Sequence, residues 1–314
     1  MSHKMIHQIT LPTPFPVGDV HVYLIKDEKN VLIDCGCKTE RAYELLLNRL
    51  NQLGTSIDEI DELWLTHAHP DHSGLAARLQ KKHGIAVGIH QTELRYMHKN
   101  QFVDRFGEWF KKHQVPDYLV LAMDGGRVWY QSYYDDLVPD FLIKDKQKLE
   151  TGSLTFTAKH LPGHAPGHLA FFAENIIISG DVLLDHISSN AILTFEHDTP
   201  KRVRALCQQR DSLNFLKDQK GRVYPGHGAI FDNPQPIAQK HLDAQEVRYQ
   251  QVIKALKEGE ASMFTITKRV FPQADQPGIT FLCISEVVGY LDLSIDRGDA
   301  LFDESSNTFR YIGT

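Results

Sequence analysis

The sequence predicts an α/β fold, and three features of its pattern lead to this prediction. Strand-like and helix-like segments alternate through residues 1–91 and again through 148–235, an arrangement that packs helices on the faces of a sheet. Residues 92–147 are rich in aromatic and polar side chains and indicate a helical insertion. From residue 236 the pattern changes to three helices and a hairpin. We therefore predict a main domain over 1–235, carrying the insertion at 92–147, and a small second domain over 236–314.

The first elements follow from apolar runs bounded by turn-forming residues. Residues 20–25 and 31–34 flank the polar stretch 27–30, which predicts two strands joined by a turn. Thr39 is placed to open a helix and Gly54 to end it. In order, the first part of the chain is expected to hold strands at 20–25, 31–34, 60–65 and 85–89, and helices at 39–53 and 74–82.

The insertion has two interpretations. Phe102, Phe106, Trp109 and Phe110 recur at helical spacing, which favours an amphipathic helix that buries this stripe against the body of the protein. The alternative is a lid over a functional site, with Gly125-Gly126 as its mobile point. Burial against the body is favoured for most of the aromatic rings of the insertion, which include those at 129–134, and both interpretations can hold for different residues.

The remainder of the chain repeats the strand-then-helix scheme and then departs from it. Expected elements are strands at 154–158, 168–172, 175–178 and 221–224, a helix at 199–217, helices at 237–257, 262–270 and 281–295, and a hairpin at 300–302 and 309–312. Three helices followed by a hairpin resemble a winged-helix module.

Composition excludes several classes of protein. The net charge of −6 argues against a dedicated binder of nucleic-acid phosphates, which is usually basic. Four cysteines in 314 residues do not make a disulfide framework. Residues 1–18 lack the apolar core of a signal peptide, and no apolar run is long enough to cross a bilayer. We therefore expect a cytoplasmic location and no membrane partner.

The motif H-x-H-x-D-H at residues 67–72 carries the chemistry of the sequence. Imidazole nitrogen and carboxylate oxygen suit zinc and its first-row neighbours. In an extended segment the side chains of His67 and His69 face the same way, so both could bind one ion. Asp71 and His72 lie beyond, where the chain turns, and are free to face a second ion. A plain helix N-terminus capped by Asp71 or Ser73 is the alternative.

Three later residues complete a possible metal centre. His164, Asp181 and His227 each follow an apolar strand-like run and stand beside glycine or proline. Each alone fits an ordinary turn, but together with the motif they supply five imidazoles and two carboxylates. This set is large enough to hold two ions if Asp181 bridges them.

These residues resemble the signature of the metallo-β-lactamase fold superfamily over residues 1–235. His67-x-His69-x-Asp71-His72, Gly163-His164, Gly180-Asp181 and Gly226-His227-Gly228 occur in the order found in that family. The resemblance implies a four-layer αβ/βα sandwich with the site at one edge. It also implies that His67, His69 and His164 hold one ion, that Asp71, His72 and His227 hold the other, and that Asp181 is shared.

The tail resembles the C-terminal extension of one hydrolase branch of this superfamily. True zinc β-lactamases often carry cysteine where Asp181 stands, so antibiotic hydrolysis is not expected. The sequence looks more like the glyoxalase II, lactonase and ribonuclease branches, the last typified by β-lactamase-like protein 2. A residue-by-residue match to the thiol-cofactor contacts of glyoxalase II is absent.

The predicted function is that of a dinuclear metal-dependent hydrolase acting on a small ester, thioester or lactone. Two divalent ions about 3.5–4 Å apart would share a hydroxide at neutral pH, and Asp71 is the candidate to orient it. Zinc is the first choice of metal, with iron or manganese as alternatives. A phosphodiesterase or ribonuclease and a catalytically silent metal-binding regulator are the competing interpretations.

Three further residues are candidates for supporting roles behind the metal ligands: Asp34, His168 and His186. Asp34 is the first choice as acceptor for the second nitrogen of a ligand histidine, whereas His168 fits a purely structural role equally well. Residues 234–314 carry eight Lys and Arg against eleven Asp and Glu, which disfavours nucleic acid as a partner. We expect a small-molecule substrate, and a homodimer remains open.

Overall fold

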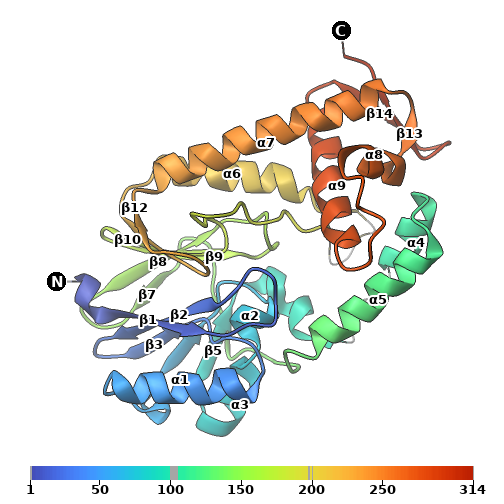
Figure 1. The fold of residues 1–314 in the computed structure, drawn as a ribbon. Coiled ribbons are helices and arrows are strands. Elements are labelled where there is room, and N and C mark those ends of the chain that lie inside the picture. Colours follow the sequence, from blue (N-terminus) through green and yellow to red (C-terminus); the bar gives the residue numbers. More distant parts are fainter. Residues whose placement is uncertain (1, 100–104, 197–198, 200, 314) are drawn as a thin grey trace.

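The computed structural model describes residues 2–99, 105–196, 199 and 201–313, and its centre is a pair of facing six-stranded sheets (Figure 1). The first sheet has the order β1 (Ile6–Leu11), β2 (Val20–Lys26), β3 (Asn30–Ile33), β4 (Glu62–Trp64), β5 (Ala86–Ile89) and β6 (Phe141–Leu142). The second has the order β12 (Phe231–Asp232), β11 (Arg222–Pro225), β10 (Ile176–Gly180), β9 (Leu169–Ala173), β8 (Thr155–His160) and β7 (Lys148–Glu150).

Helices cover the outer face of each sheet. On the first sheet lie α1 (Glu40–Gln52) and α3 (Ala76–His83), and on the second lie α6 (Ala205–Lys217) and α7 (Pro234–Lys257). Short helical turns occur at η1 (Ser2–Met5), η2 (Ile57–Glu59) and η3 (Gln91–Met97). The α/β class and the αβ/βα sandwich are therefore confirmed.

Strand β2 shows how the sequence specifies these layers. Val22 and Leu24 pack with the helices on the outer face, whereas Tyr23 and Ile25 pack against the second sheet. Because both faces of the strand are covered, an almost continuous apolar run replaces the usual polar and apolar alternation.

Most predicted elements are present, with several corrections. The predicted helix 74–82 begins only at Ala76, after the separate turn of α2 (Pro70–Ser73), because the Leu75 N–H donates to the Gly36 carbonyl instead of to a helical one. The predicted helix 199–217 begins at Ala205, since Arg202 and Arg204 are engaged by acidic side chains of α9 (Thr280–Asp296). The strand predicted at 60–65 shortens to β4.

Five strands were not predicted, and each lies at the edge of a sheet: β1, β6, β7, β12 and β13 (Ala261–Ser262). Strand β1 is only half buried, and β6 and β7 have two and three residues. Such short or mixed-burial strands leave little periodic signal in a sequence.

The insertion forms α4 (Arg105–Lys112) and α5 (Asp117–Gln131). Phe106 and Phe110 pack near Phe281 of α9, with ring centroids 5.8 and 6.5 Å away, so this part of the stripe is structural packing. Phe102 lies outside the described residues. Gly125 and Gly126 lie inside the continuous helix α5, and the lid remains a prediction.

The C-terminal part contains the predicted helices and hairpin. Helix α7 is followed by α8 (Met263–Val270), α9, and a small sheet of β13 (Ala261–Ser262), β15 (Thr308–Tyr311) and β14 (Ala300–Asp303). The first half of α7 packs in the core beside α6, and its second half joins the C-terminal core. The winged-helix assignment stays a prediction. Among the helices of the described residues, none combines the length and the apolar character needed to cross a bilayer.

Candidate metal centre

One edge of the sandwich gathers the predicted ligands, because they follow strands that run in the same direction. Strands β8 and β10 both run antiparallel to β9, and β11 runs parallel to β10. His164, Asp181 and His227 follow β8, β10 and β11, and the motif 67–72 follows β4 of the first sheet. The turns therefore meet where the two sheets face each other.

The seven side chains form two groups with a carboxylate between them. Ligand atoms lie within 4.8 Å of one another in the set His67, His69 and His164, in the set Asp71, His72 and His227, and in the set His67, His72 and Asp181. Asp181 Oδ1 is 3.3 Å from His72 Nε2, and its Oδ2 is 3.6 Å from Nε2 of both His164 and His227. The structure therefore brings the seven predicted residues together, and their division between two ions with Asp181 shared remains a prediction.

Hydrogen bonds fix the orientation of three histidine rings. The Nδ1–H groups of His72, His164 and His227 donate to Asp34 Oδ2 at 2.7 Å, to the Asn190 carbonyl at 3.0 Å and to the Asp19 carbonyl at 2.8 Å. Each ring therefore presents its Nε2, without a proton in the neutral tautomer, to the centre.

Several atoms at the centre have no hydrogen-bond partner. Among the described residues, four atoms of the centre are buried without a hydrogen-bond partner: Nε2 of His67, His72 and His227, and Oδ1 of Asp181. Buried polar atoms in native proteins are nearly always paired. Orphaned nitrogen and oxygen acceptors that converge on one place fit a divalent cation.

Burial and neighbouring charges shift the pKa values of the candidate ligands in different directions. Burial lowers the pKa of His69 to about 3 and that of His67 well below its ordinary value. The pKa of Asp181 is well below its ordinary value because His72 and His227 outweigh the opposing effect of burial. Burial alone would lower the pKa of His72, but Asp181, Asp34 and Asp71 hold it well above the ordinary value. The carboxylates thus make the centre attract positive charge, which protonated His72 carries in part and which a bound cation would supply in place of that proton.

Asp34 lies behind the centre, as expected for a supporting residue. Its backbone has a φ of +62°, an uncommon conformation for a residue with a side chain. The carboxylate accepts hydrogen bonds from the Thr66 N–H and hydroxyl, both at 2.8 Å, and from His72. Asp34 therefore joins the end of β3 to the start of the motif.

The other two candidates for supporting roles occupy different environments. His168 is fully buried, accepts a hydrogen bond from the Asp181 N–H at 3.0 Å and stacks on His67 with centroids 4.9 Å apart. It therefore positions two of the ligand residues. The His186 side chain is 40% exposed and lies 3.2 Å from Asp185. The structure does not place it in any of the ligand groups.

Close packing explains the glycine that precedes His227. A Cβ atom at Gly226 would lie 2.2 Å from Asp181 Oδ1 and 2.7 Å from His72 Cε1. Any side chain at this position would displace two of the ligand residues.

Glu93 is a residue of the site that the sequence did not reveal. This carboxylate on η3 is almost fully buried, and it accepts the Ala68 N–H at 2.9 Å and the Gly167 N–H at 2.6 Å. It thereby ties the motif loop to the loop of His164. Burial raises its pKa to about 7 in spite of the two hydrogen bonds. A single glutamate beside a helical turn carries no distinctive signal in a sequence.

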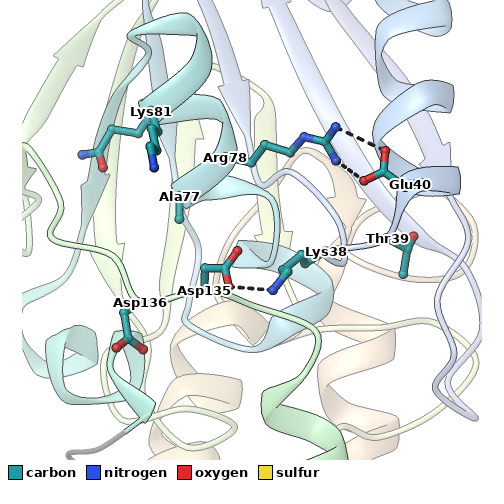
Figure 2. A pocket seen from close by; sticks show the side chains of 9 residues that line it. Lys38, Thr39, Glu40, Ala77, Arg78, Lys81, Asp135 and Asp136 are labelled. Atoms are coloured by element: carbon teal, nitrogen blue, oxygen red, sulfur yellow. Dashed lines mark hydrogen bonds and ion pairs between the residues drawn. The ribbon is translucent and has the colours of Figure 1, made fainter.

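A separate surface pocket of about 890 Å³ lies near α1 and α3. Four of its lining charges pair with one another: Lys38 with Asp135 and Arg78 with Glu40, each at 2.6 Å (Figure 2). None of the seven ligand residues lines this pocket. It is therefore distinct from the metal centre.

Comparisons with known proteins agree with this geometry. The sequence profile of the metallo-beta-lactamase superfamily matches residues 15–227. The chain belongs to this superfamily. The probable metallo-hydrolase YqjP of Bacillus subtilis (strain 168) is 31% identical over 301 residues, 93% of each chain. The hydroxyacylglutathione hydrolase GloC of Haemophilus influenzae is 28% identical over 163 residues, 50% of this chain and 63% of its own.

A solved structure extends the likeness to the C-terminal part. The metallo-beta-lactamase family protein TTHA1429 of Thermus thermophilus superimposes with a TM-score of 0.83 at 22% identity, covering 98% of this superfamily member and 99% of its own chain. This shows the fold. The relatives named metallo-hydrolases support a hydrolase, and the superfamily fold implies divalent metal ions.

Proposed function

We propose that the protein is a dinuclear metal-dependent hydrolase that cleaves a small ester, thioester or lactone. The observation that carries this proposal is the pair of ligand groups with Asp181 between them and with unpartnered Nε2 atoms directed inward. His67, His69 and His164 would hold one ion, and Asp71, His72 and His227 the other. We propose zinc first, with iron or manganese as alternatives, because these metals share the same donor types.

Two bound cations would polarise the scissile carbonyl and lower the pKa of water toward neutrality. The chain itself supplies orientation and charge. Asp34 and the Asn190 carbonyl fix the rings of His72 and His164 so that neither can rotate away. The Asp71 carboxylate lies 3.3 Å from His227 Nε2, and the imidazoles of His72 and His227 lower its pKa in spite of its burial. It is therefore suited to orient the attacking water.

Charge favours a carbonyl substrate over a nucleic acid. In the C-terminal part, Arg248 and Arg297 pair with Glu286 and Glu246 at 2.8 Å, and Lys268 pairs with Asp275 at 2.6 Å. Cations that already pair with carboxylates are less able to bind nucleic-acid phosphates and to release the counterions of those phosphates. The name of the relative GloC gives hydroxyacylglutathione as its substrate, and this compound is a thioester. The likeness supports including thioesters among the candidate substrates of this protein.

The test combines metal analysis with a substrate panel. Protein stripped by a chelator and reloaded with zinc, manganese or iron is expected to bind two ions per chain and to hydrolyse members of a thioester and lactone panel. The variant His67→Ala/Asp181→Ala should lose both properties, whereas His7→Gln, on β1 away from the centre, should retain them. Full activity in the double variant would contradict the proposal. Salt-sensitive cleavage of RNA would favour a ribonuclease, and metal binding without any turnover would favour a silent regulator.

A further inference from the structure

Four aromatic side chains form a cluster beside the metal centre, which we call the aromatic wall: Phe15, Trp129, Tyr130 and Tyr133. Phe15 belongs to the loop between β1 and β2, and the other three lie in or just after the end of α5. The Phe15 ring centroid is 5.5 Å from that of Trp129 and 5.6 Å from those of Tyr130 and Tyr133. These distances are typical of packed aromatic pairs. Figure 1 shows this loop and the end of α5 approaching each other near α2.

The aromatic wall extends from a metal ligand to solvent. At its inner end, the Tyr130 ring contacts His69 edge-on, with centroids 6.3 Å apart. At its outer end, Trp129 is 48% exposed. A large aromatic side chain left half exposed next to a reactive centre is a common feature of ligand sites, which are mostly apolar with a few polar groups that fix orientation.

Cations near the aromatic wall are already engaged by neighbouring groups. Arg127 on α5 lies 3.8 Å from Asp124 and donates to Gln131. Lys38, whose N–H donates to the Tyr133 carbonyl, pairs with Asp135. Because these cations have partners, this side of the centre offers apolar surface rather than free positive charge.

We infer that the aromatic wall binds an apolar acyl group, aryl or medium-length alkyl, and so places the ester or thioester carbonyl at the metal centre. This inference rests on the proposed hydrolase function and adds a substrate class to it. When an acyl group covers the exposed aromatic surface, apolar area is removed from water and the binding free energy becomes more favourable. Substrates with an apolar acyl group should therefore have a lower KM.

The test measures acyl preference in N-acetylcysteamine thioesters of acetic, hexanoic and phenylacetic acid. In the metal-loaded protein we expect kcat/KM to be about tenfold higher or more for the two larger acyl groups, mainly through KM. Trp129→Ala should reduce this ratio to near one, and Trp129→Phe should restore most of it. The control is Tyr118→Ala, which removes another exposed aromatic ring from the same helix, and it should match the wild type.

A binding measurement separates failure of the inference from failure of the proposed function. The probe is the hexanoyl ketone analogue, in which a methylene group replaces the thioester sulfur, and calorimetry measures its affinity. Binding that weakens about tenfold in Trp129→Ala supports the aromatic wall, even if no thioester is turned over and the hydrolase proposal fails. An unchanged acyl ratio in Trp129→Ala overturns the inference. The absence of probe binding to the wild type also overturns it.

Discussion

Glu93→Gln tests the role of the buried carboxylate that joins the two ligand loops. Gln has nearly the same shape, but its amide offers one acceptor, so one of the N–H groups of Ala68 and Gly167 would face an NH₂ group. The substitution also removes a buried negative charge. These two effects act in opposite directions on stability, and pH separates them because only the charge titrates.

The magnitude follows from the pKa of Glu93. Its folded value of about 7 lies between two and three pH units above the ordinary value of 4.5, which corresponds to about 3 kcal/mol. Because the folded pKa is raised, the native state favours the protonated acid. The associated stability is fully present below pH 4.5 and is lost as the pH rises through 7. Between pH 5.0 and 6.5 the loss is about 2 kcal/mol in the wild type, and it is absent in Glu93→Gln.

Urea unfolding of the two proteins in a chelator, at several pH values from 5.0 to 6.5, measures this difference. Other groups that titrate in this range contribute to both proteins and cancel in the comparison. We expect the unfolding free energy of Glu93→Gln to gain about 2 kcal/mol relative to the wild type across the range. Parallel pH profiles would refute the reasoning, because they would mean that the native state does not favour the protonated carboxyl group.

Three further predictions concern single residues. Asp34→Asn is expected to lower metal affinity about 10–100-fold, because His72 Nδ1 loses its carboxylate acceptor; competition with a chelating dye measures this, and unchanged affinity would contradict it. Gly167→Ala should destabilise the protein by about 1–3 kcal/mol, since the added Cβ would lie 2.8 Å from Glu93 Cγ; urea unfolding at pH 7 provides the test. Burial lowers the pKa of His113 to about 4, so the wild type loses stability as the pH falls from 6.5 toward 4. In His113→Phe this part of the pH dependence should disappear, which thermal midpoints at pH 5 and 7 would show.

The candidate ligands could be selected from the sequence because their signals are local. His164, Asp181 and His227 each follow an apolar run and stand next to glycine or proline, and the motif 67–72 is dense enough to be distinctive. The same local signals located the central strands and the helix ends, such as Thr39, which caps α1, and Gly54, which follows the last residues of that helix. Whether the assembled side chains bind metal remains a prediction for the metal analysis.

The supporting contacts were beyond prediction because they depend on residues far apart in the chain. The His164 ring is held by a backbone carbonyl 26 residues later, and the His227 ring by one 208 residues earlier. Any residue type could supply these carbonyls, so neither leaves a trace in the sequence. Glu93 likewise acts through the N–H groups of Ala68 and Gly167, and its role depends on burial rather than on a motif.

The C-terminal part bears on the metal centre through the segment that contains Asn190. The Leu193 N–H in that segment donates to Ser285 Oγ of α9 at 3.2 Å, and Arg202 forms two hydrogen bonds of 2.6 and 2.9 Å with Asp292 of the same helix. Because the Asn190 carbonyl orients His164, α9 helps to fix the ring of a candidate ligand without contacting it. The C-terminal part therefore supports the geometry of the centre through the contacts of α9 with this segment. This role requires no contact with nucleic acid.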